Sequence, residues 1–416
     1  MTRPIAVDLF AGAGGLSLGF EQAGFDIMAS VEIDPIHCSA HKYNFPMCKT
    51  ICRSVVDVTG EYVREVSGIG EKEIDVVIGG APCQGFSLIG KRALDDDRNK
   101  LVYHYVRLVL ELKPKYFIFE NVKGLTVGKH KQFLVEIMDA FKDGGYDVVS
   151  DYKVLNAADY GVPQDRRRLF LMGGRKGIAL PSYPEPLSIR TTVGDAIGDI
   201  PDAEKYPELW GRDWVYAKFG EQSLYSSYLH GVGKDPSDFS YPRIFNKDKL
   251  TCSLLTDHSD ISRGRFVETL PDTVEPISRF KKLSMNGLCN TLRAGTASDR
   301  GAFTSPRPIH PIYPRVITVR EAARLHSYPD WFRFHVTKWH GFRQVGNSVP
   351  PMLARSVGLQ IMKVLGVTPK KPTKKIKLGD ESLVAISMSD AASMFGVSSN
   401  VIAKRIKNSN KEVVCE

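Results

Sequence analysis

Residues 5–24 read IAVDLFAGAGGLSLGFEQAG, and this stretch decides the fold. Its β-branched, apolar start predicts a strand, and its end has apolar positions at helical spacing. Gly12, Gly14 and Gly15 permit a tight turn between the strand and the helix, and they let a ligand approach the backbone closely. The spacing G-x-G-G is not the dinucleotide fingerprint G-x-G-x-x-G, so a plain tight turn is the alternative. The stretch therefore predicts a strand, a candidate ligand-binding loop and a helix.

The same rhythm continues to about residue 175. Strands are predicted at 5–10, 26–33, 74–80, 116–121, 146–155 and 168–174. Helices are predicted at 16–24, 35–44, 101–113 and 131–144. Alternation of this kind predicts an α/β fold, a doubly wound and mostly parallel sheet of the Rossmann-like type. Ligands of such folds bind at the carboxyl ends of the strands.

The composition of the chain changes near residue 181. The sequence that follows is rich in aromatic and basic residues, and its apolar positions show little periodicity. We expect an α/β domain made of residues 1–185 and 340–366. A smaller, irregular, β-rich domain is expected at 186–339. Residues 367–416 follow as a basic linker and a small helical tail.

Within that tail, residues 388–407 carry a two-helix pattern. Ser389 or Asp390 can cap a first helix, Gly396 can end it, and Ser398 can cap a second. The pattern is typical of a helix-turn-helix, which would give the tail a contact with promoter DNA. A helical hairpin docked on the main body is the alternative.

Bulk properties limit the class of protein. The chain has 416 residues and a net charge of +9, which suits a polyanionic partner but is weak support by itself. No apolar run is long enough for a membrane span. Seven irregularly spaced cysteines favour reduced thiols in a cytoplasm. The cluster of His37, Cys38, His41, Cys48 and Cys52 lacks the usual zinc spacing, so we expect packed thiols and no metal.

Two carboxylates follow predicted strands near the glycine loop. Glu32 in VEIDP ends the second strand and can accept both hydroxyls of a ribose. A third strand is expected to end at SVVDVT, where Asp57 could bind an adenine amino group. Together with the loop, these residues predict an adenosine-containing cofactor.

Catalytic candidates follow the next two strands. In IDVVIGGAPCQGFS, Cys83 comes after the apolar run and is flanked by Pro82 and Gly85, which favours a reactive thiolate over a packed thiol. In FIFENVKG, Glu120 follows an apolar run whose low dielectric would raise the pKa of its carboxyl. A loop thiol and a capping carboxylate are the alternatives for each residue alone.

Further polar residues appear in two later motifs. In QDRRRLF, alternation puts Arg166 and Arg168 on one face of a strand, where they can grip a base, a phosphate or the catalytic carboxylate. A surface row of ion pairs is the alternative. In VGNSVPP, Asn347 and Ser348 precede a helix as caps or cofactor contacts.

Taken in order, these motifs resemble those of the prokaryotic cytosine-5 DNA methyltransferases. The matching segments are DLFAGAGG, VEIDP, APCQGFS, ENVKGL, QDRRRLF and VGNSVPP, supported by TLRAGT and REAARLHSYPD. The resemblance covers about 1–175 and 285–367. Residues 186–285 match only as a region of variable sequence, and the tail after 367 lies outside the shared pattern.

The resemblance implies a Rossmann-like DNA (cytosine-5)-methyltransferase with a target-recognition domain at 186–339. Cys83 would attack carbon 6 of a flipped-out cytosine, and Glu120 would donate to its ring nitrogen 3. Arg166 would support the flipped base and Arg168 the Glu120 carboxyl. The binding site for S-adenosylmethionine would be lined by Phe10, Gly12, Gly14, Glu32, Asp57, Pro82, Asn347 and Ser348.

The resemblance also implies duplex DNA as the partner and a role in restriction-modification or as an orphan modification enzyme. We expect a monomeric, cytoplasmic bacterial protein associated with the nucleoid. Two alternatives stay open at this point. An RNA cytosine methyltransferase would be built on the same motifs, and a non-catalytic DNA-binding regulator would use the tail.

Overall fold

The structure is a computed structural model that describes residues 3–82, 100–126, 130–150, 152–188, 190–295 and 307–400. Predictions that fall on other residues, including those for Cys83, lie outside the described residues. Within the described ranges, no helix is both long and apolar enough to cross a membrane.

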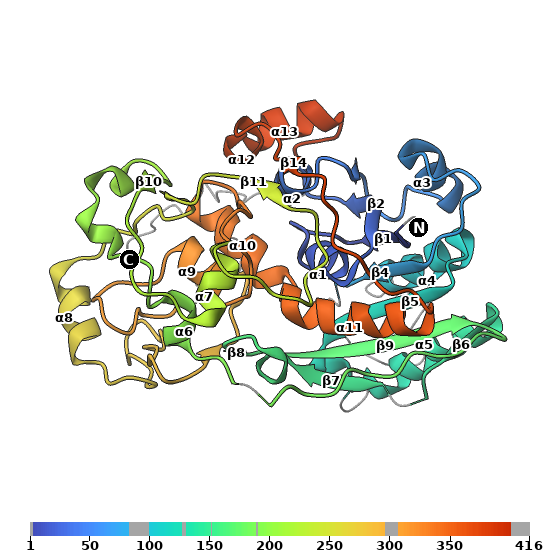
Figure 1. Cartoon of the computed structure of the whole chain (residues 1–416), viewed down its shortest axis with the longest axis horizontal. Helices are drawn as coiled ribbons and strands as arrows, with labels where there is room; N and C mark the ends of the chain where they lie inside the picture. The colour runs from blue at the N-terminus through green and yellow to red at the C-terminus, as the bar shows by residue number, and fades with distance from the viewer. Residues whose placement is uncertain are drawn as a thin grey trace, which may run out of the picture.

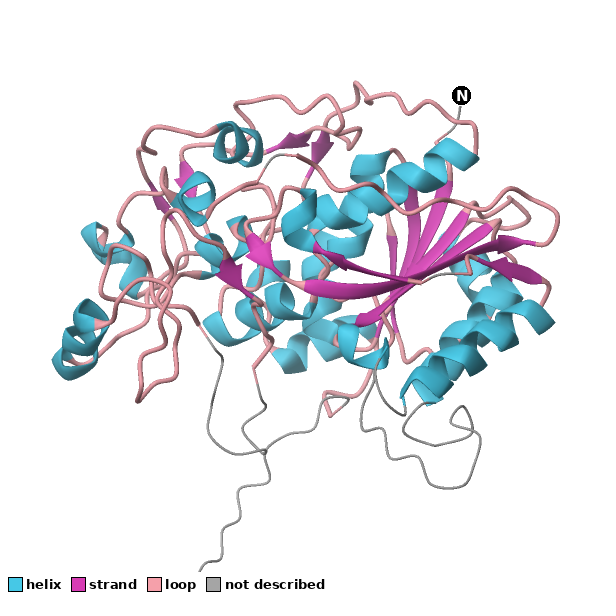
Figure 2. Ribbon diagram, turned by 90° about the horizontal axis from the view of Figure 1, so that it is seen from below, coloured by secondary structure: helices cyan, strands magenta, loops and turns pink. Residues whose placement is uncertain are grey.

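The α/β part is built on an eight-stranded sheet. Figures 1 and 2 show this sheet with helices packed around it. Its strands are β1 (Ile5–Leu9), β2 (Asp26–Glu32), β3 (Lys49–Cys52), β4 (Val76–Gly79), β5 (Tyr116–Val122), β6 (Tyr146–Val148), β7 (Lys153–Asn156) and β9 (Arg167–Arg175). The strand order is β3-β2-β1-β4-β5-β9-β6, with β7 also paired to β9. Strands β1 to β5 are parallel, whereas β9 runs antiparallel to β5, β6 and β7. The predicted doubly wound, mostly parallel sheet is confirmed.

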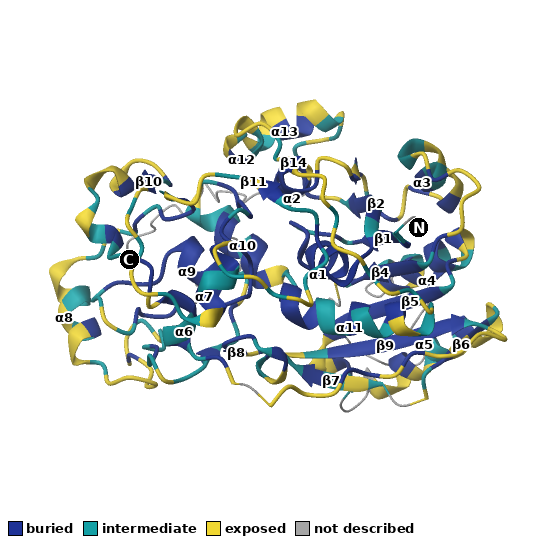
Figure 3. Ribbon diagram, viewed as in Figure 1, coloured by how far each residue is buried: buried dark blue, intermediate teal, exposed yellow. Residues whose placement is uncertain are grey.

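Helices cover both faces of this sheet, and the central strands β1, β4 and β5 are almost entirely buried (Figure 3). One face packs against α1 (Gly15–Ala23), α2 (Pro35–Asn44) and α11 (Pro351–Val364). The other packs against α3 (Gly60–Ser67), α4 (Lys100–Leu112) and α5 (His130–Asp143). All four residues of β4 are buried, which explains its unbroken apolar sequence. Helix α11 packs closely against α1. Gly19 permits this close packing, since a side chain at this position would overlap Ala354.

Three local predictions differ from the structure. Strand β3 ends at Cys52, and the expected strand end at Asp57 is a turn closed by a bond from Asp57 N to Ser54 O of 3.0 Å. Helix α3 was not predicted. It begins after Thr59, whose side chain accepts from Tyr62 N. The predicted strand 146–155 is two strands, β6 and β7, separated at the exposed Ser150.

The region between residues 190 and 335 consists of short elements joined by loops, as the sequence predicts. The expected β-rich character is wrong, because each described strand here has two residues and most of the regular structure is helical. They are β10 (Val215–Tyr216), β11 (Arg243–Ile244), β12 (Lys249–Leu250), β13 (Cys289–Asn290), α6 (Val193–Ile197), α7 (Leu224–Leu229), α8 (Asp260–Glu268) and α9 (Val319–Arg324). Strand β8 (Gln164–Asp165) pairs with β13, and α10 (Lys338–Asn347) precedes α11. The division into domains at residues 185 and 340 stays a prediction.

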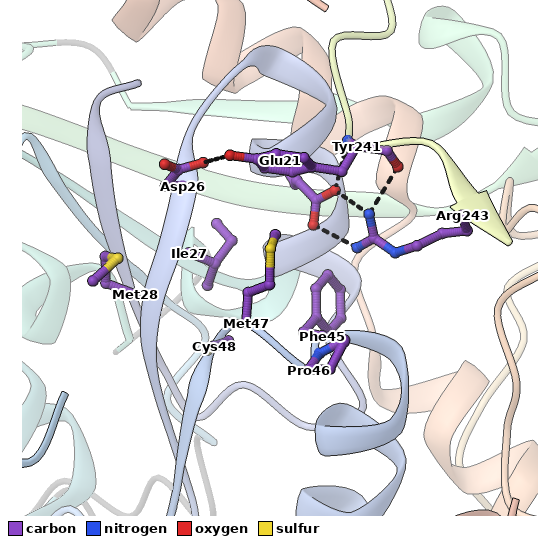
Figure 4. Close-up of a pocket in the computed structure, with 10 residues that line it drawn as sticks. All are labelled: Glu21, Asp26, Ile27, Met28, Phe45, Pro46, Met47, Cys48, Tyr241 and Arg243. Atoms are coloured by element: carbon purple, nitrogen blue, oxygen red, sulfur yellow. Dashed lines mark hydrogen bonds and ion pairs between the residues drawn. The ribbon is translucent and has the colours of Figure 1, made fainter. Parts of the chain in front are cut away.

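Residues 235–244, which we call the strap, return to the α/β part of the chain. Arg243 forms a buried ion pair with Glu21 of α1, with two N–O distances of 2.7 Å. Tyr241 donates from its hydroxyl to Asp26 at 3.0 Å. A pocket lies beneath the strap, lined by the residues drawn in Figure 4. Because Asp26 begins β2 and Glu32 ends it, this pocket is at the far end of β2 from the predicted cofactor edge.

The tail is docked on the main body. Strand β14 (Ile376–Lys377) pairs in parallel with β11, and α12 (Ser382–Ala385) and α13 (Met388–Phe395) contact α2 (Figure 1). Helix α13 is the first of the two predicted tail helices, and Gly396 ends it at φ 65 as expected. Its cap is Ser387, not Ser389 or Asp390, because the Ser387 hydroxyl accepts from Asp390 N. Most of the second predicted helix lies outside the described residues, so the contact with promoter DNA stays a prediction.

Candidate active site

The glycine loop lies at the carboxyl edge of the sheet, between β1 and α1. Phe10 has a φ of 62, and Gly12 and Gly14 have φ of 55 and 105, so the loop uses the left-handed region repeatedly. A Cβ placed on Gly12 would meet no atom within 4 Å. The loop is therefore open at Gly12 and offers its backbone to a ligand.

Glu32 lies beside this loop at the end of β2. Its Oε2 accepts from Gly12 N at 2.9 Å, and its Oε1 accepts from Ile33 N at 3.0 Å and Asp34 N at 2.9 Å. A carboxylate has about four acceptor positions. These three bonds fix the side chain against the loop and leave Oε2 with one position for a further donor, such as a ribose hydroxyl.

The other predicted cofactor contacts are placed at the same edge or near it. Asp57 is exposed in the turn beyond β3, and Pro82 is exposed in the segment that follows β4. Asn347 is exposed at the end of α10, and Ser348 is half-buried and donates to Val345 O at 2.8 Å. Their contact with a cofactor stays a prediction.

Glu120 and Arg168 form the ion pair expected of them. Arg168 Nε lies 3.0 Å from Glu120 Oε1, and the Glu120 residue is 8% exposed. Burial raises the pKa of the Glu120 carboxyl, and this effect exceeds the opposite effect of Arg168 and Arg166. The structure thus holds a carboxyl that keeps its proton to higher pH than an ordinary glutamate.

Gly80 lies against the carboxyl group of Glu120. A Cβ at Gly80 would lie 2.6 Å from Glu120 Oε2, so only glycine leaves room for the observed side chain. Gly80 also begins the segment from β4 toward Cys83, which itself lies outside the described residues. The end of β5 and the segment after β4 are therefore in direct contact.

Asn121 is a site residue that the sequence analysis did not select. Its side chain is buried and donates from Nδ2 to Ala81 O at 2.9 Å. This bond ties the end of β5 to the chain two residues before Cys83. The available signal was its position directly after Glu120, at the end of a buried strand.

Arg166 is placed differently from Arg168. It is fully buried, and its guanidinium donates to Leu292 O at 2.7 Å, Gly346 O at 2.8 Å and Ser348 O at 2.7 Å. Arg166 therefore joins the start of β9 to two distant segments, one of which carries the predicted cofactor residue Ser348. The predicted support of a flipped base by Arg166 stays a prediction.

The cysteine and histidine cluster shows packing contacts. Cys38, Cys48 and Cys52 are free and buried. Across the part of the chain that the structure describes, no group of three or more His, Cys, Asp or Glu side chains is arranged to hold a metal ion.

Substitution of Gly80 by alanine tests the packing around Glu120. The new methyl group has to displace the carboxyl. If Glu120 is the general acid that the resemblance implies, a shift of about 1 Å costs roughly 100-fold in rate. We expect kcat to fall about 100-fold, with a melting temperature near that of the wild type. Gly264→Ala is the matched control, because a Cβ there meets no atom within 4 Å. Equal activity of the two variants would contradict the assigned contact.

A doubly wound sheet with an open glycine loop, a loop-bound carboxylate and a buried acid at one edge is typical of Rossmann-like α/β enzymes, which bind their ligands at the carboxyl ends of the strands. Within this class, the family model described as C-5 cytosine-specific DNA methylase matches residues 5–363. The chain belongs to this family of DNA (cytosine-5)-methyltransferases.

Individual relatives agree with this assignment. The Type II methyltransferase M.XorII of Xanthomonas oryzae pv. oryzae is 74% identical over 405 residues, which cover 97% of this chain and 95% of the relative. The Type II methyltransferase M1.HphI of Haemophilus parahaemolyticus is 34% identical and covers 86% of each chain. A crystal structure from an E. coli prophage, named as a DNA modification methyltransferase, is 34% identical with a TM-score of 0.73 and covers 87% of this chain and 99% of its own. The S. pombe Dnmt2 methyltransferase, at 15% identity, a TM-score of 0.54 and coverage of 88% and 99%, shares the fold.

Proposed function

We propose that this enzyme transfers the methyl group of S-adenosylmethionine to carbon 5 of a flipped-out cytosine in a specific duplex DNA sequence, through a covalent adduct at Cys83. The observation that carries the proposal is the Glu120 carboxyl, buried and paired with Arg168. It touches the segment that leads to Cys83. The names of the two Type II relatives support a role in restriction-modification.

The described cofactor edge fits an adenosine-containing methyl donor. Gly12 presents an open backbone, and Glu32 keeps one acceptor position for a ribose hydroxyl. S-adenosylmethionine, when bound, supplies the methyl group as an electrophile. The residues proposed to hold it are Phe10, Gly12, Gly14, Glu32, Asp57, Pro82, Asn347 and Ser348.

The chemistry that the chain's own residues perform starts at Cys83. Its thiolate bonds to carbon 6 of the cytosine, and the electron pair of the 5,6 double bond moves toward carbon 5. Glu120 gives its proton to ring nitrogen 3, which prevents negative charge from building up on the ring. After methylation, a base removes the proton of carbon 5, the thiolate leaves carbon 6, and Glu120 regains its proton. The double bond is thereby restored.

Attack on carbon 6 also requires access to the face of the ring. A stacked base offers no such access, so the target has to leave the helix. In this proposal Arg168 orients the Glu120 carboxyl that reaches ring nitrogen 3, and Asn121 fixes the backbone before Cys83. The recognition of neighbouring bases is assigned to residues 186–339.

A transfer assay with tritiated S-adenosylmethionine tests this function against the RNA alternative. We expect incorporation into duplex DNA at one recurring sequence, mapped by bisulfite sequencing, and background counts with tRNA. Efficient methylation of tRNA and none of DNA would contradict the proposal.

A further inference from the structure

A buried chain of polar side chains runs beneath the glycine loop, through Asp8, Ser17 and His41. Ser17 Oγ donates to Asp8 Oδ2 at 2.6 Å and lies 3.0 Å from His41 Nε2. On the far side of the ring, His41 Nδ1 lies 3.3 Å from Ser30 Oγ and 3.4 Å from Thr50 Oγ1. Asp8, Ser17 and His41 are each 0% exposed.

The direction of these hydrogen bonds follows from the number of protons. A serine hydroxyl has one proton, and that of Ser17 is directed to Asp8. His41 Nε2 therefore donates to Ser17, and His41 Nδ1 accepts from Ser30 or Thr50. Burial lowers the pKa of His41 to about 3, so its ring is neutral and can serve as donor and acceptor at once.

The chain connects the two sides of the loop. Asp8 lies in β1, just before the loop, and Ser17 lies in the first turn of α1, just after it. His41 comes from α2 and stacks on Phe45 with ring centroids 4.6 Å apart. The three residues therefore fix the entrance and exit of the loop against a separate helix.

His41 also touches the loop itself. Gly14 lies against the stacked rings, and a Cβ there would overlap Phe45 and come within 3.0 Å of His41 Cδ2. The His41 ring thus forms part of the wall that shapes the loop at its residue of φ 105. Its hydrogen bonds to Ser17 on one edge and to β2 or β3 on the other determine where that wall stands.

We propose that Asp8, Ser17 and His41 are positioning residues that set the glycine loop in the conformation that binds the methyl donor. The inference rests on the proposed function, because it takes the loop as the donor site. Loss of the chain leaves the loop free to relax, so the cost appears in donor binding. The transfer step at Cys83 and Glu120 stays intact once the donor is bound.

Two variants test the proposal. His41→Phe keeps the ring on Phe45 but removes both hydrogen bonds, and Ser17→Ala interrupts the chain at its centre. A lost hydrogen bond corresponds to about 1 kcal/mol, or roughly fivefold in a binding constant. We expect each variant to raise the KM for S-adenosylmethionine about five- to tenfold, with kcat at saturation within about twofold.

Three further variants separate positioning from stability. Ser39→Ala removes another buried serine hydroxyl, one that donates to Pro35 O at 2.8 Å within α2, and should leave the KM unchanged. Asparagine at position 8 keeps a side-chain oxygen that can accept the hydrogen bond from Ser17. Asp8→Asn should therefore stay near the wild-type KM, whereas Asp8→Leu should match Ser17→Ala.

Direct binding of S-adenosylmethionine to the purified full chain, by calorimetry, distinguishes the possible failures. If the wild type binds no donor, the proposed function is wrong. If the wild type binds it and His41→Phe and Ser17→Ala bind it equally well, only the positioning inference is overturned. An equal rise in KM for Ser39→Ala and Ser17→Ala would also overturn it, because general destabilisation would then explain the effect.

Discussion

Replacement of Cys83 by alanine is expected to lower methyl transfer to duplex DNA by about 10⁴-fold or more, as removal of a covalent nucleophile does in other enzymes. Without the thiolate no bond forms at carbon 6, and carbon 5 stays too electron-poor to accept the methyl group. Protonation by Glu120 cannot replace that bond. Binding of DNA should persist, because the contacts assigned to residues 186–339 are unchanged.

DNA containing 5-fluorocytosine gives a second readout of the same step. Fluorine occupies the place of the proton that has to leave carbon 5, so the wild type should stay attached to this DNA through denaturing electrophoresis. Cys83→Ala should form no such adduct. Cys252→Ser is the control, since Cys252 is buried against Phe334 N and serine can keep that contact. Turnover by Cys83→Ala, or its absence in Cys252→Ser, would refute the assignment of the nucleophile.

The fold could be predicted where its determinants are local. The strand, loop and helix of residues 5–23 follow from periodicity and glycine content, and the structure places β1 and α1 there. The contacts of the strap with α1 and β2 could not be predicted, because the residues that form them are distant in sequence. Arg243 pairs with Glu21 across 222 residues, and no local pattern in either segment announces that contact. The docking of β14 on β11 could not be predicted for the same reason.

In the candidate site, too, local features could be predicted and contacts between distant segments could not. Alternation along one strand left a base, a phosphate or the catalytic carboxylate open as partners of Arg166 and Arg168, and the family resemblance assigned Arg168 to Glu120. That ion pair is present. Alternation does not specify the partners of Arg166, which are backbone carbonyl groups 126, 180 and 182 residues away. In the sequence, His41 stands out only as a member of the cysteine and histidine cluster between residues 37 and 52. Its bonds to Ser17 and to Ser30 or Thr50 depend on how α2 packs on the sheet, which a sequence pattern does not specify.

Substitution of Glu120 by glutamine is expected to reduce kcat by about 10²- to 10⁴-fold, the range that a positioned general acid contributes. Glutamine has nearly the same shape, and its side-chain oxygen can keep the 3.0 Å contact that Glu120 Oε1 makes with Arg168 Nε. It has no acidic proton to give to ring nitrogen 3. The adduct with 5-fluorocytosine should form more slowly but still form, because the Cys83 nucleophile is intact.

The pH dependence gives this prediction its sharpest test. Burial raises the pKa of Glu120, so the folded protein holds this proton at pH values where an unfolded glutamate has lost it. Loss of the Glu120 proton should therefore set the alkaline limb of the wild-type kcat/KM profile, which declines as the pH rises through the raised pKa. The stability contribution has the same sign, since the folded state binds more protons than the unfolded state in that window. Glu120→Gln should lose this titration from both the rate profile and the melting temperature.

Glu73→Gln serves as control, because Glu73 is half-exposed and its pKa is lowered by Lys115 and Arg175. A Glu120→Gln variant that keeps the wild-type profile would assign the titration, and with it the general acid, to another group.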